Sequence, residues 1–172
     1  MNVVAADRPS TVKIATPPYS RREGMQQDRR TSPRTDGNHC FVCGDANSLG
    51  LHVRFWLDGE VCRGEFTPGP EHSGYDGITH GGIVFSLLDD VMANWMFLQG
   101  MRCYTAKCEI RFHEALPIGR RVVLEGRLLR QKQKLMVMEG RALCADGGAQ
   151  VASCQASFIV DETTMPPASN AG

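Results

Sequence analysis

The sequence has no excess of either charge and no long apolar run, and each absence excludes a class of protein. Its 19 basic residues balance 19 acidic ones in a chain of 172, so bulk attraction does not make it a general binder of nucleic acids or anionic membranes. The longest apolar stretch, residues 83–98, is interrupted by polar side chains and falls short of the roughly 18–20 apolar residues that a membrane span needs. We therefore expect neither nucleic acid nor membrane as a partner.

The cysteines are few for a disulfide-rich protein, and their number is odd. Seven cysteines are spread through the chain, unlike the close spacing of a secreted disulfide scaffold. Residues 1–27 alternate polar residues with prolines and lack the apolar stretch of about 7–15 residues that a secretory signal contains. Together these features predict a cytoplasmic protein.

Composition divides the chain into three parts. Residues 1–38 are rich in arginine with almost no apolar periodicity, which predicts a disordered leader, and Met25 within it is an alternative start. Residues 161–172 are predicted to be a flexible tail. Residues 39–160 are expected to form one domain, since a chain of this length can bury a sufficient core without a disulfide or a metal.

The first part of this domain has the pattern of a strand, a turn and a second strand. Residues 51–57 alternate apolar and polar side chains with the period of two of a half-buried strand. Asp58 and Gly59 form a typical hairpin turn into residues 60–67. Residues 68–77 are rich in proline and glycine, which predicts a loop.

Residues 81–99 are predicted to form one long helix. They contain no proline, are apolar on most sides, and are followed by Gly100 in the position favoured for a helix C-cap. A helix that is apolar on most sides is buried. Its polar exceptions fall on one stripe: Ser86, Asp89, Asp90 and Asn94.

Four further strands are predicted after the helix, at residues 104–113, 120–131, 135–145 and 150–160, with turn signals between them. Alternation in the first of these places Ala106 on the inner face and Thr105 on the outer face. An antiparallel sheet with one face covered by the helix is the simplest packing of these elements. The sequence therefore predicts an α+β fold in which an antiparallel β-sheet wraps around a long central helix.

The start of the helix carries the motif with chemical meaning. His80-Gly81-Gly82 opens it, and Asp89 follows nine residues after His80. Glycines in a first turn allow a substrate to approach the backbone, and the free N–H groups there stabilise a polarised carbonyl. A carboxylate farther along can activate water or attack that carbonyl directly.

This motif, its offset and the element order resemble the hotdog-fold acyl-CoA thioesterases of the phenylacetate-degradation (PaaI) type, over roughly residues 40–160. The resemblance implies the hotdog fold, an acyl-CoA substrate, no cofactor, and a homo-oligomer that is a dimer or a dimer of dimers (homotetramer). It also implies catalytic roles for Gly81 as the polarising amide, for Asp89 as general base or nucleophile, and for His80. Positions that bind substrate are matched by His72, Gly82, Thr105 and Asp90.

Each of these residues also has a structural interpretation. Asp89 is also explained as a structural acid paired across an interface. Asp90 is also explained as a helix acid paired with a neighbouring residue, although the roles of Asp89 and Asp90 could be exchanged. His80 is equally well explained as a cap or hinge, and His72 as a solvated loop residue. Thr105 belongs to a residue type common in strands.

A zinc site near the start of the domain is a further interpretation of the sequence. Cys40 and Cys43 have the spacing of half a tetrahedral zinc site. No second Cys-x-x-Cys pair follows, so His39 and His52 would have to complete the ligand set. Residues 40–51 also resemble a leader of one hotdog subgroup, which favours a packing or turn role. We expect no metal.

Hydrolysis of an acyl-CoA to free acid and coenzyme A is therefore the expected function, with two alternatives. A non-catalytic acyl-CoA binding module has no need of a carboxylate beside the carbonyl. Hotdog enoyl-thioester hydratases have a different pattern, with a catalytic Asp and His on one helix in an order that this chain lacks, since no histidine lies between His80 and His113. Four basic residues are placed either to meet coenzyme A phosphates or to be solvated: Arg127, Arg130, Lys132 and Lys134.

Helix geometry predicts at least a dimer. Gly81 and Asp89 are eight residues apart, so their backbones are separated by roughly 12 Å along a straight helix. One aspartate side chain does not span that distance. Two helices packed antiparallel about a twofold axis would bring Gly81 of one subunit near Asp89 of the other.

Overall fold

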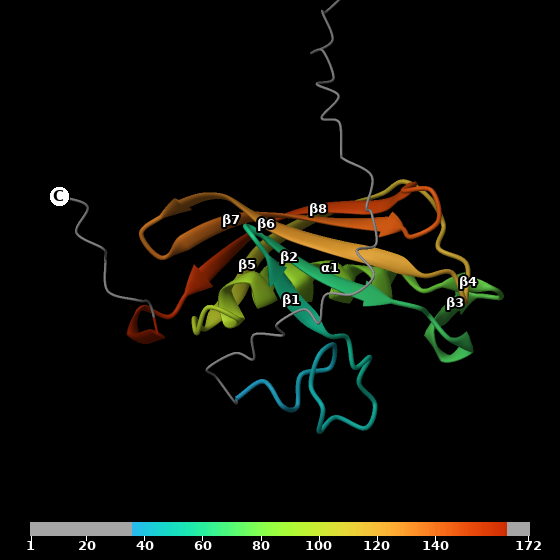
Figure 1. Cartoon of the computed structure of the whole chain (residues 1–172), viewed down its shortest axis with the longest axis horizontal. Helices are drawn as coiled ribbons and strands as arrows, with labels where there is room; N and C mark the ends of the chain where they lie inside the picture. Colours follow the sequence, from blue (N-terminus) through green and yellow to red (C-terminus); the bar gives the residue numbers. More distant parts are fainter. Residues whose placement is uncertain (1–35, 165–172) are drawn as a thin grey trace, which may run out of the picture.

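One long helix packs against one face of a six-stranded antiparallel sheet (Figure 1). The computed structural model describes residues 36–164. The helix is α1 (Gly81–Phe97). The strands of the sheet are β1 (Phe55–Asp58), β2 (Val61–Phe66), β5 (Cys103–Phe112), β6 (Val122–Lys132), β7 (Leu135–Cys144) and β8 (Gln150–Val160).

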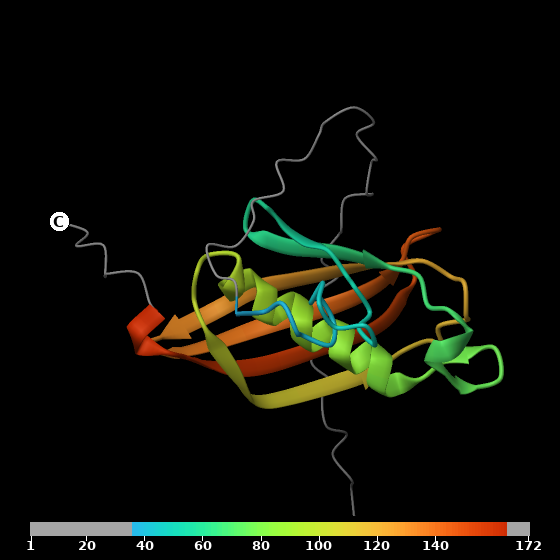
Figure 2. The ribbon, with the colours of Figure 1, turned by 90° about the horizontal axis from the view of Figure 1, so that it is seen from below.

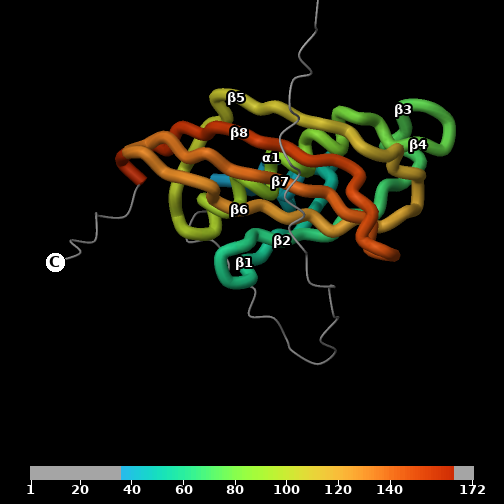
Figure 3. The backbone as a smooth tube through the Cα atoms, turned by 90° about the horizontal axis from the view of Figure 1, so that it is seen from above, coloured from blue at the N-terminus to red at the C-terminus, as the bar shows by residue number. Residues whose placement is uncertain are grey.

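The strands lie in the order β1-β2-β6-β7-β8-β5, and every neighbouring pair is antiparallel (Figure 3). The edges of the sheet are therefore β1 and β5. This is the α+β hotdog arrangement, and the predicted fold class is confirmed.

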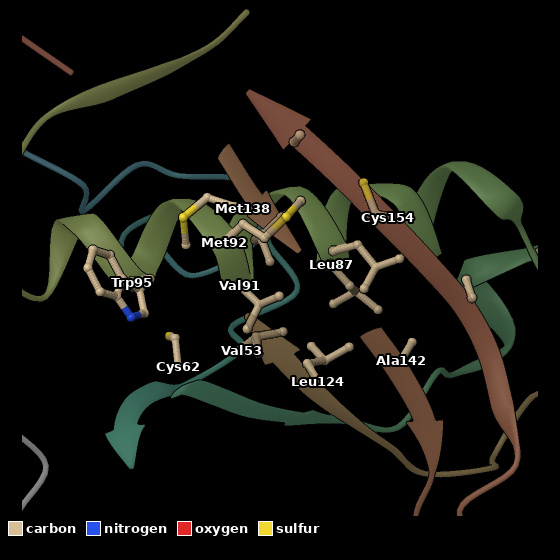
Figure 4. Packing of buried hydrophobic residues seen from close by; sticks show 14 of the residues in the cluster. Val53, Cys62, Leu87, Val91, Met92, Trp95, Leu124, Met138, Ala142 and Cys154 are labelled. Carbon is tan, nitrogen blue, oxygen red and sulfur yellow. The ribbon is translucent and has the colours of Figure 1, made fainter. Parts of the chain in front are cut away.

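The core lies between α1 and the sheet. Figure 4 shows helix side chains such as Leu87 and Met92 meeting strand side chains such as Leu124 and Met138. All four are fully buried. The buried face of the helix consists of Val84, Leu87, Leu88, Val91, Met92, Asn94, Trp95 and Met96. All of these residues except Asn94 are apolar, and removing their surface from water is the main contribution that holds α1 on the sheet.

Two paired glycines allow α1 to approach the sheet closely. Gly126 of β6 and Gly140 of β7 are register partners. A Cβ atom on Gly126 would lie 2.7 Å from the carbonyl oxygen of Val91, in the helix backbone. A Cβ atom on Gly140 would instead meet the flexible side chain of Met92 at 3.3 Å. The position of Gly126 therefore sets the distance between the two layers.

The predicted strand over residues 51–57 is shorter in the structure. Strand β1 begins only at Phe55, because His52 has a positive φ of 52° that interrupts the extended backbone. A hairpin turn follows β1 as predicted, but its two central residues are Gly59, with φ 57°, and Glu60, because Asp58 still belongs to β1 and pairs with Val61.

The predicted loop over residues 68–77 contains short structure. A 3₁₀ helix, Pro70–His72, leads into β3 (Ser73–Tyr75), which pairs with β4 (Ile78–Thr79) immediately before α1. The predicted helix is confirmed, although it ends at Phe97 and not at Gln99.

A β-bulge reverses the predicted faces at the start of β5. Thr105 pairs with Phe158 and Lys107 pairs with Ser157, so Ala106 is skipped. Ala106 is exposed, and the Thr105 side chain contacts the helix. The prediction for these two residues was wrong because a bulge inserts one extra residue and shifts the alternation.

The segment before β1 crosses the outer face of α1 (Figure 2). Its contacts include Cys40 with Asp90 and Cys43 with Asn94. Most of the predicted leader and tail lies outside the described residues. Of their described residues, Asp36 forms an ion pair with Arg102, and a 3₁₀ helix, Glu162–Thr164, follows β8.

Within the described residues, no helix combines the length and apolar character that crossing a membrane requires.

The glycine pair provides a stability test. Gly126→Ala should lower the free energy of unfolding by about 1–3 kcal/mol, the usual cost of overpacking, because its Cβ meets helix backbone that cannot move aside. Gly140→Ala is the matched control and should cost clearly less, since the Met92 side chain can shift. Urea unfolding of both variants measures the difference, and equal losses would contradict the proposed close contact.

Candidate active site

His80 caps the helix and orients its first turn. Its backbone is extended, and its Nδ1 accepts a hydrogen bond of 2.9 Å from the N–H of Gly82. The N–H of Gly82 is therefore engaged, which supports the cap interpretation of His80. The N–H of Gly81 has no acceptor among the described residues, and both glycines are exposed. The helix start thus presents one free amide at the positive end of the helix dipole.

Asp89 and Thr105 are brought together by the bulge in β5. The hydroxyl of Thr105 donates a hydrogen bond of 2.9 Å to Oδ1 of Asp89. Burial raises the pKa of the Asp89 carboxyl, and the Thr105 hydrogen bond opposes that rise. No Lys, Arg or His within the described chain forms an ion pair with Asp89. The carboxylate is therefore fixed in position and more basic than an exposed one.

Asp90 faces a different set of partners. One of its carboxylate oxygens accepts a hydrogen bond of 2.9 Å from the Asn94 amide, and the other lies 3.5 Å from the Cys40 sulfur. Burial raises the pKa of Asp90 to about 7. Although adjacent in sequence, Asp89 and Asp90 lie on different sides of the helix and are not interchangeable in their contacts.

His72 is fixed within the loop before the helix. Its Nδ1 accepts a hydrogen bond of 2.8 Å from the N–H of Gly69, and its ring packs edge-on against Phe66. Its carbonyl accepts a bond from the N–H of His80. The ring is thus held by the protein, unlike a solvated loop residue, and the backbone of His72 supports the helix start.

A cavity of about 230 Å³ adjoins the helix start. Its walls include Gly81, Thr79 and Phe112. The Thr79 hydroxyl is buried with no hydrogen-bond partner among the described residues. The ring of Phe112 comes within 3.4 Å of the position that a Cβ on Gly81 would occupy. A small group can therefore reach the free amide without a side chain blocking it.

The site residues predicted from sequence form two groups within one chain. His72, His80, Gly81 and Gly82 surround the helix start, while Asp89 and Thr105 meet about two turns farther along α1. A third group contains the predicted Asp90 together with Cys40 and Cys43, and this grouping was not predicted. The signal for it was present in the polar stripe, where Asp90 and Asn94 are four residues apart and so share a helix face.

The basic residues near the β6–β7 hairpin have partners. Arg127 forms an ion pair with Glu139, and Lys134 forms one with Glu162. These contacts account for two of the four charges without a phosphate. The interpretation as hairpin charges is thus favoured for Arg127 and Lys134.

The sequence matches a known family over the segment that contains these groups. A model of the Thioesterase superfamily matches residues 76–150. The acyl-coenzyme A thioesterase THEM5 of Mus musculus is 33% identical over 60 residues, which are 35% of this chain and 24% of that protein. The chain therefore spans about a quarter of the length of this relative.

Solved structures share the fold. A thioesterase superfamily protein superposes with a TM-score of 0.66 at 28% identity, over 71% of this chain and 63% of the other. A hypothetical thioesterase from Streptococcus pneumoniae, crystallised with coenzyme A, superposes with a TM-score of 0.59 at 17% identity. The superposition covers 63% of this chain and 87% of that one. The PaaI protein of Escherichia coli superposes with a TM-score of 0.59 at 19% identity, over 63% of this chain and 79% of that one.

These findings show that residues 76–150 are similar to the Thioesterase superfamily and that the chain shares the hotdog fold of solved thioesterase structures. PaaI is one structural neighbour among several, so the expected PaaI subgroup is not established by them.

The capping contact predicts a specific loss of stability. His80→Ala removes the acceptor for the Gly82 N–H and should lower the free energy of unfolding by about 1 kcal/mol. His80→Asn is the matched control, because asparagine supplies a side-chain oxygen to the same turn and should retain most of the stability. Thermal unfolding distinguishes the two, and equal stability of His80→Ala and wild type would show that the cap contributes nothing.

Proposed function

We propose that this protein hydrolyses an acyl-CoA thioester to a free carboxylic acid and coenzyme A. The observation that carries the proposal is the half-buried Asp89 carboxylate, held by Thr105 and free of any ion pair in the described chain. It lies on the helix that begins with a free amide, inside the segment that matches the Thioesterase superfamily. The coenzyme A bound in the S. pneumoniae neighbour supports the choice of substrate class.

The reaction assigns a different role to each group. The Gly81 N–H donates to the carbonyl oxygen of the thioester and stabilises the negative charge that develops there. Asp89 takes a proton from a water molecule while the oxygen of that water attacks the carbonyl carbon. The tetrahedral intermediate then breaks its C–S bond, and the leaving sulfur takes up a proton to give coenzyme A. In the other version, the Asp89 oxygen attacks the carbon directly, and the C–S bond breaks to release the thiolate and leave an anhydride. Water then hydrolyses the anhydride to the free acid and restores the Asp89 carboxylate, and the proton that is set free goes to the thiolate.

The site requires two copies of the chain. Gly81 and Asp89 stand roughly 12 Å apart along the same helix, too far to act on one carbonyl. We place the amide of one subunit next to the carboxylate of the other, which gives two equivalent sites in a twofold dimer.

Exposed surface next to both groups supports this arrangement. Strand β5 is an edge of the sheet, and an edge strand of ten residues offers unpaired backbone groups to another chain. Apolar side chains are exposed on β5 and on the nearby helix surface: Tyr104, Phe112 and Phe85. Antiparallel pairing of two β5 strands would cover this surface and bring the two helices together.

Loss of the carboxylate tests hydrolysis directly. Asp89→Asn keeps the size of the side chain and should lower turnover at least about 100-fold, as expected for loss of a general base, while coenzyme A binding is retained. Thiol release from acyl-CoAs of different chain lengths is the measurement. Glu60→Gln, an exposed change in the β1–β2 turn and outside the proposed subunit contact, is the control for loss of a carboxylate.

Two outcomes would contradict the proposal. Near wild-type turnover in Asp89→Asn would move the role to Asp90 or to another mechanism. Tight acyl-CoA binding by the wild-type protein, with no thiol release for any chain length, would identify a binding module.

Complementation between inactive variants tests the shared site. Gly81→Pro removes the polarising N–H at the first helical position, where proline is tolerated, and the extended backbone of His80 is compatible with a following proline. It should lose about 100–1,000-fold in turnover. Gly81→Ala keeps the N–H, adds a Cβ in ordinary contact with Phe112, and should stay active.

Mixing Gly81→Pro with Asp89→Asn and allowing subunit exchange should restore activity, because each mixed dimer regains one complete site. Circular dichroism first verifies that Gly81→Pro is folded. No recovery from two folded, exchanging variants would contradict a site shared between subunits, and so would an active monomer.

A further inference from the structure

Three metal-binding side chains converge where the segment before β1 crosses α1. The Cys40 sulfur, the Cys43 sulfur and a carboxylate oxygen of Asp90 all lie within 4.8 Å of one another. Tetrahedral zinc holds thiolate sulfur at about 2.3 Å and carboxylate oxygen at about 2.0–2.2 Å, so its donor atoms stand roughly 3.5–3.8 Å apart. The Cys40 sulfur lies 3.5 Å from Oδ1 of Asp90. Small movements would therefore close the group around an ion.

The backbone turn places both sulfurs on one side. The N–H of Gly44 donates to the carbonyl of Cys40, and the N–H of Val42 points at the Cys40 sulfur at 3.4 Å. A Cβ atom on Gly44 would lie 2.5 Å from the Asn38 carbonyl oxygen, so this tight turn requires glycine. The Cys-x-x-Cys-Gly sequence thus forms a compact two-thiol half-site.

Asn94 fixes the third donor. Its amide nitrogen donates a hydrogen bond of 2.9 Å to Oδ2 of Asp90 and lies 3.7 Å from the Cys43 sulfur. Because Oδ2 is held by the amide, Oδ1 is the oxygen that faces Cys40. Outer contacts of this kind orient the ligands of protein metal sites.

The cluster has no cation to balance it. Asp90 forms no ion pair with a basic side chain in the described residues, and Arg102, which lines the same cavity, pairs with Asp36. Buried carboxylates are usually paired or bound to metal ions. Two thiols and a carboxylate with no basic partner form a donor set that a divalent ion would neutralise.

The cluster opens to a cavity of about 210 Å³. Cys40, Cys43 and Asp90 form part of its wall, together with Phe97 and Tyr104. The cavity offers an entry path and room for a water molecule as fourth ligand. Three protein ligands with one open position is a known zinc arrangement.

We propose that Cys40, Cys43 and Asp90 bind one Zn²⁺ ion, with the fourth position open to this cavity. Both thiols lose their protons to solvent as the ion binds, because thiolate is the ligand form. The ion links the segment before β1 to α1, across 50 positions in sequence. Neither His39 nor His52 belongs to the cluster, so the ligand set differs from the one considered from sequence. The site is independent of the proposed hydrolysis.

Metal content of the full chain tests the proposal. The protein is purified without a metal-binding tag, under reducing conditions, and analysed by mass spectrometry for zinc. Wild type should carry stoichiometric zinc. Cys40→Ser and Asp90→Asn should lose it, while the matched controls Cys108→Ser and Asp89→Asn keep it. Asn94→Leu should weaken zinc affinity by about 10–100-fold, as loss of an outer contact does.

Cobalt spectroscopy on the wild-type chain keeps the test valid if a variant does not fold. Chelator-treated, reduced protein titrated with Co²⁺ should develop a thiolate-to-cobalt absorption band and the visible bands of tetrahedral cobalt, and added Zn²⁺ should remove both. Wild-type protein without stoichiometric zinc and without this cobalt spectrum would overturn the proposal. Zinc retained equally by folded Cys40→Ser and Asp90→Asn would also overturn it.

Discussion

The close packing of α1 on the sheet is the constraint on which the other features depend. Gly126 permits a distance between helix and sheet that any Cβ at that position would prevent. At this distance, the apolar face of α1 is buried against β6 and β7, and the polar stripe is held at the margins of the helix. The directions in which Asp89 and Asp90 point are therefore consequences of core packing.

The sequence was sufficient for the larger elements because their signals are local. Apolar character along the helix and alternation in the later strands predicted α1, β6, β7 and β8 within a few residues. The sequence was insufficient where contacts between distant segments determine the backbone conformation. The bulge at Ala106 depends on how β5 pairs with β8, and the positive φ of His52 depends on the segment that crosses the helix. Neither has a signal in the residues themselves.

The bulge also explains why the candidate site was only partly predictable. The motif identified Asp89, but alternation placed Thr105 on the outer face, away from it. The extra residue turns the Thr105 hydroxyl toward the Asp89 carboxylate. The single polar stripe that the sequence predicts on α1 has two different environments in the structure, with Asp89 beside β5 and Asp90 beside Cys40. Adjacent carboxylates on one helix thus serve different neighbours, because each residue turns by about 100° from the last.

In the proposed dimer, the thioester carbonyl lies between the Gly81 amide of one subunit and Asp89 of the other. A crystal structure of Asp89→Asn with an uncleaved acyl-CoA tests it most directly. We expect a dimer with the thioester oxygen within hydrogen-bond distance of the Gly81 N–H, and with the carbonyl carbon facing residue 89 of the second subunit. A thioester bound away from Gly81, or facing both residues of the same chain, would contradict it.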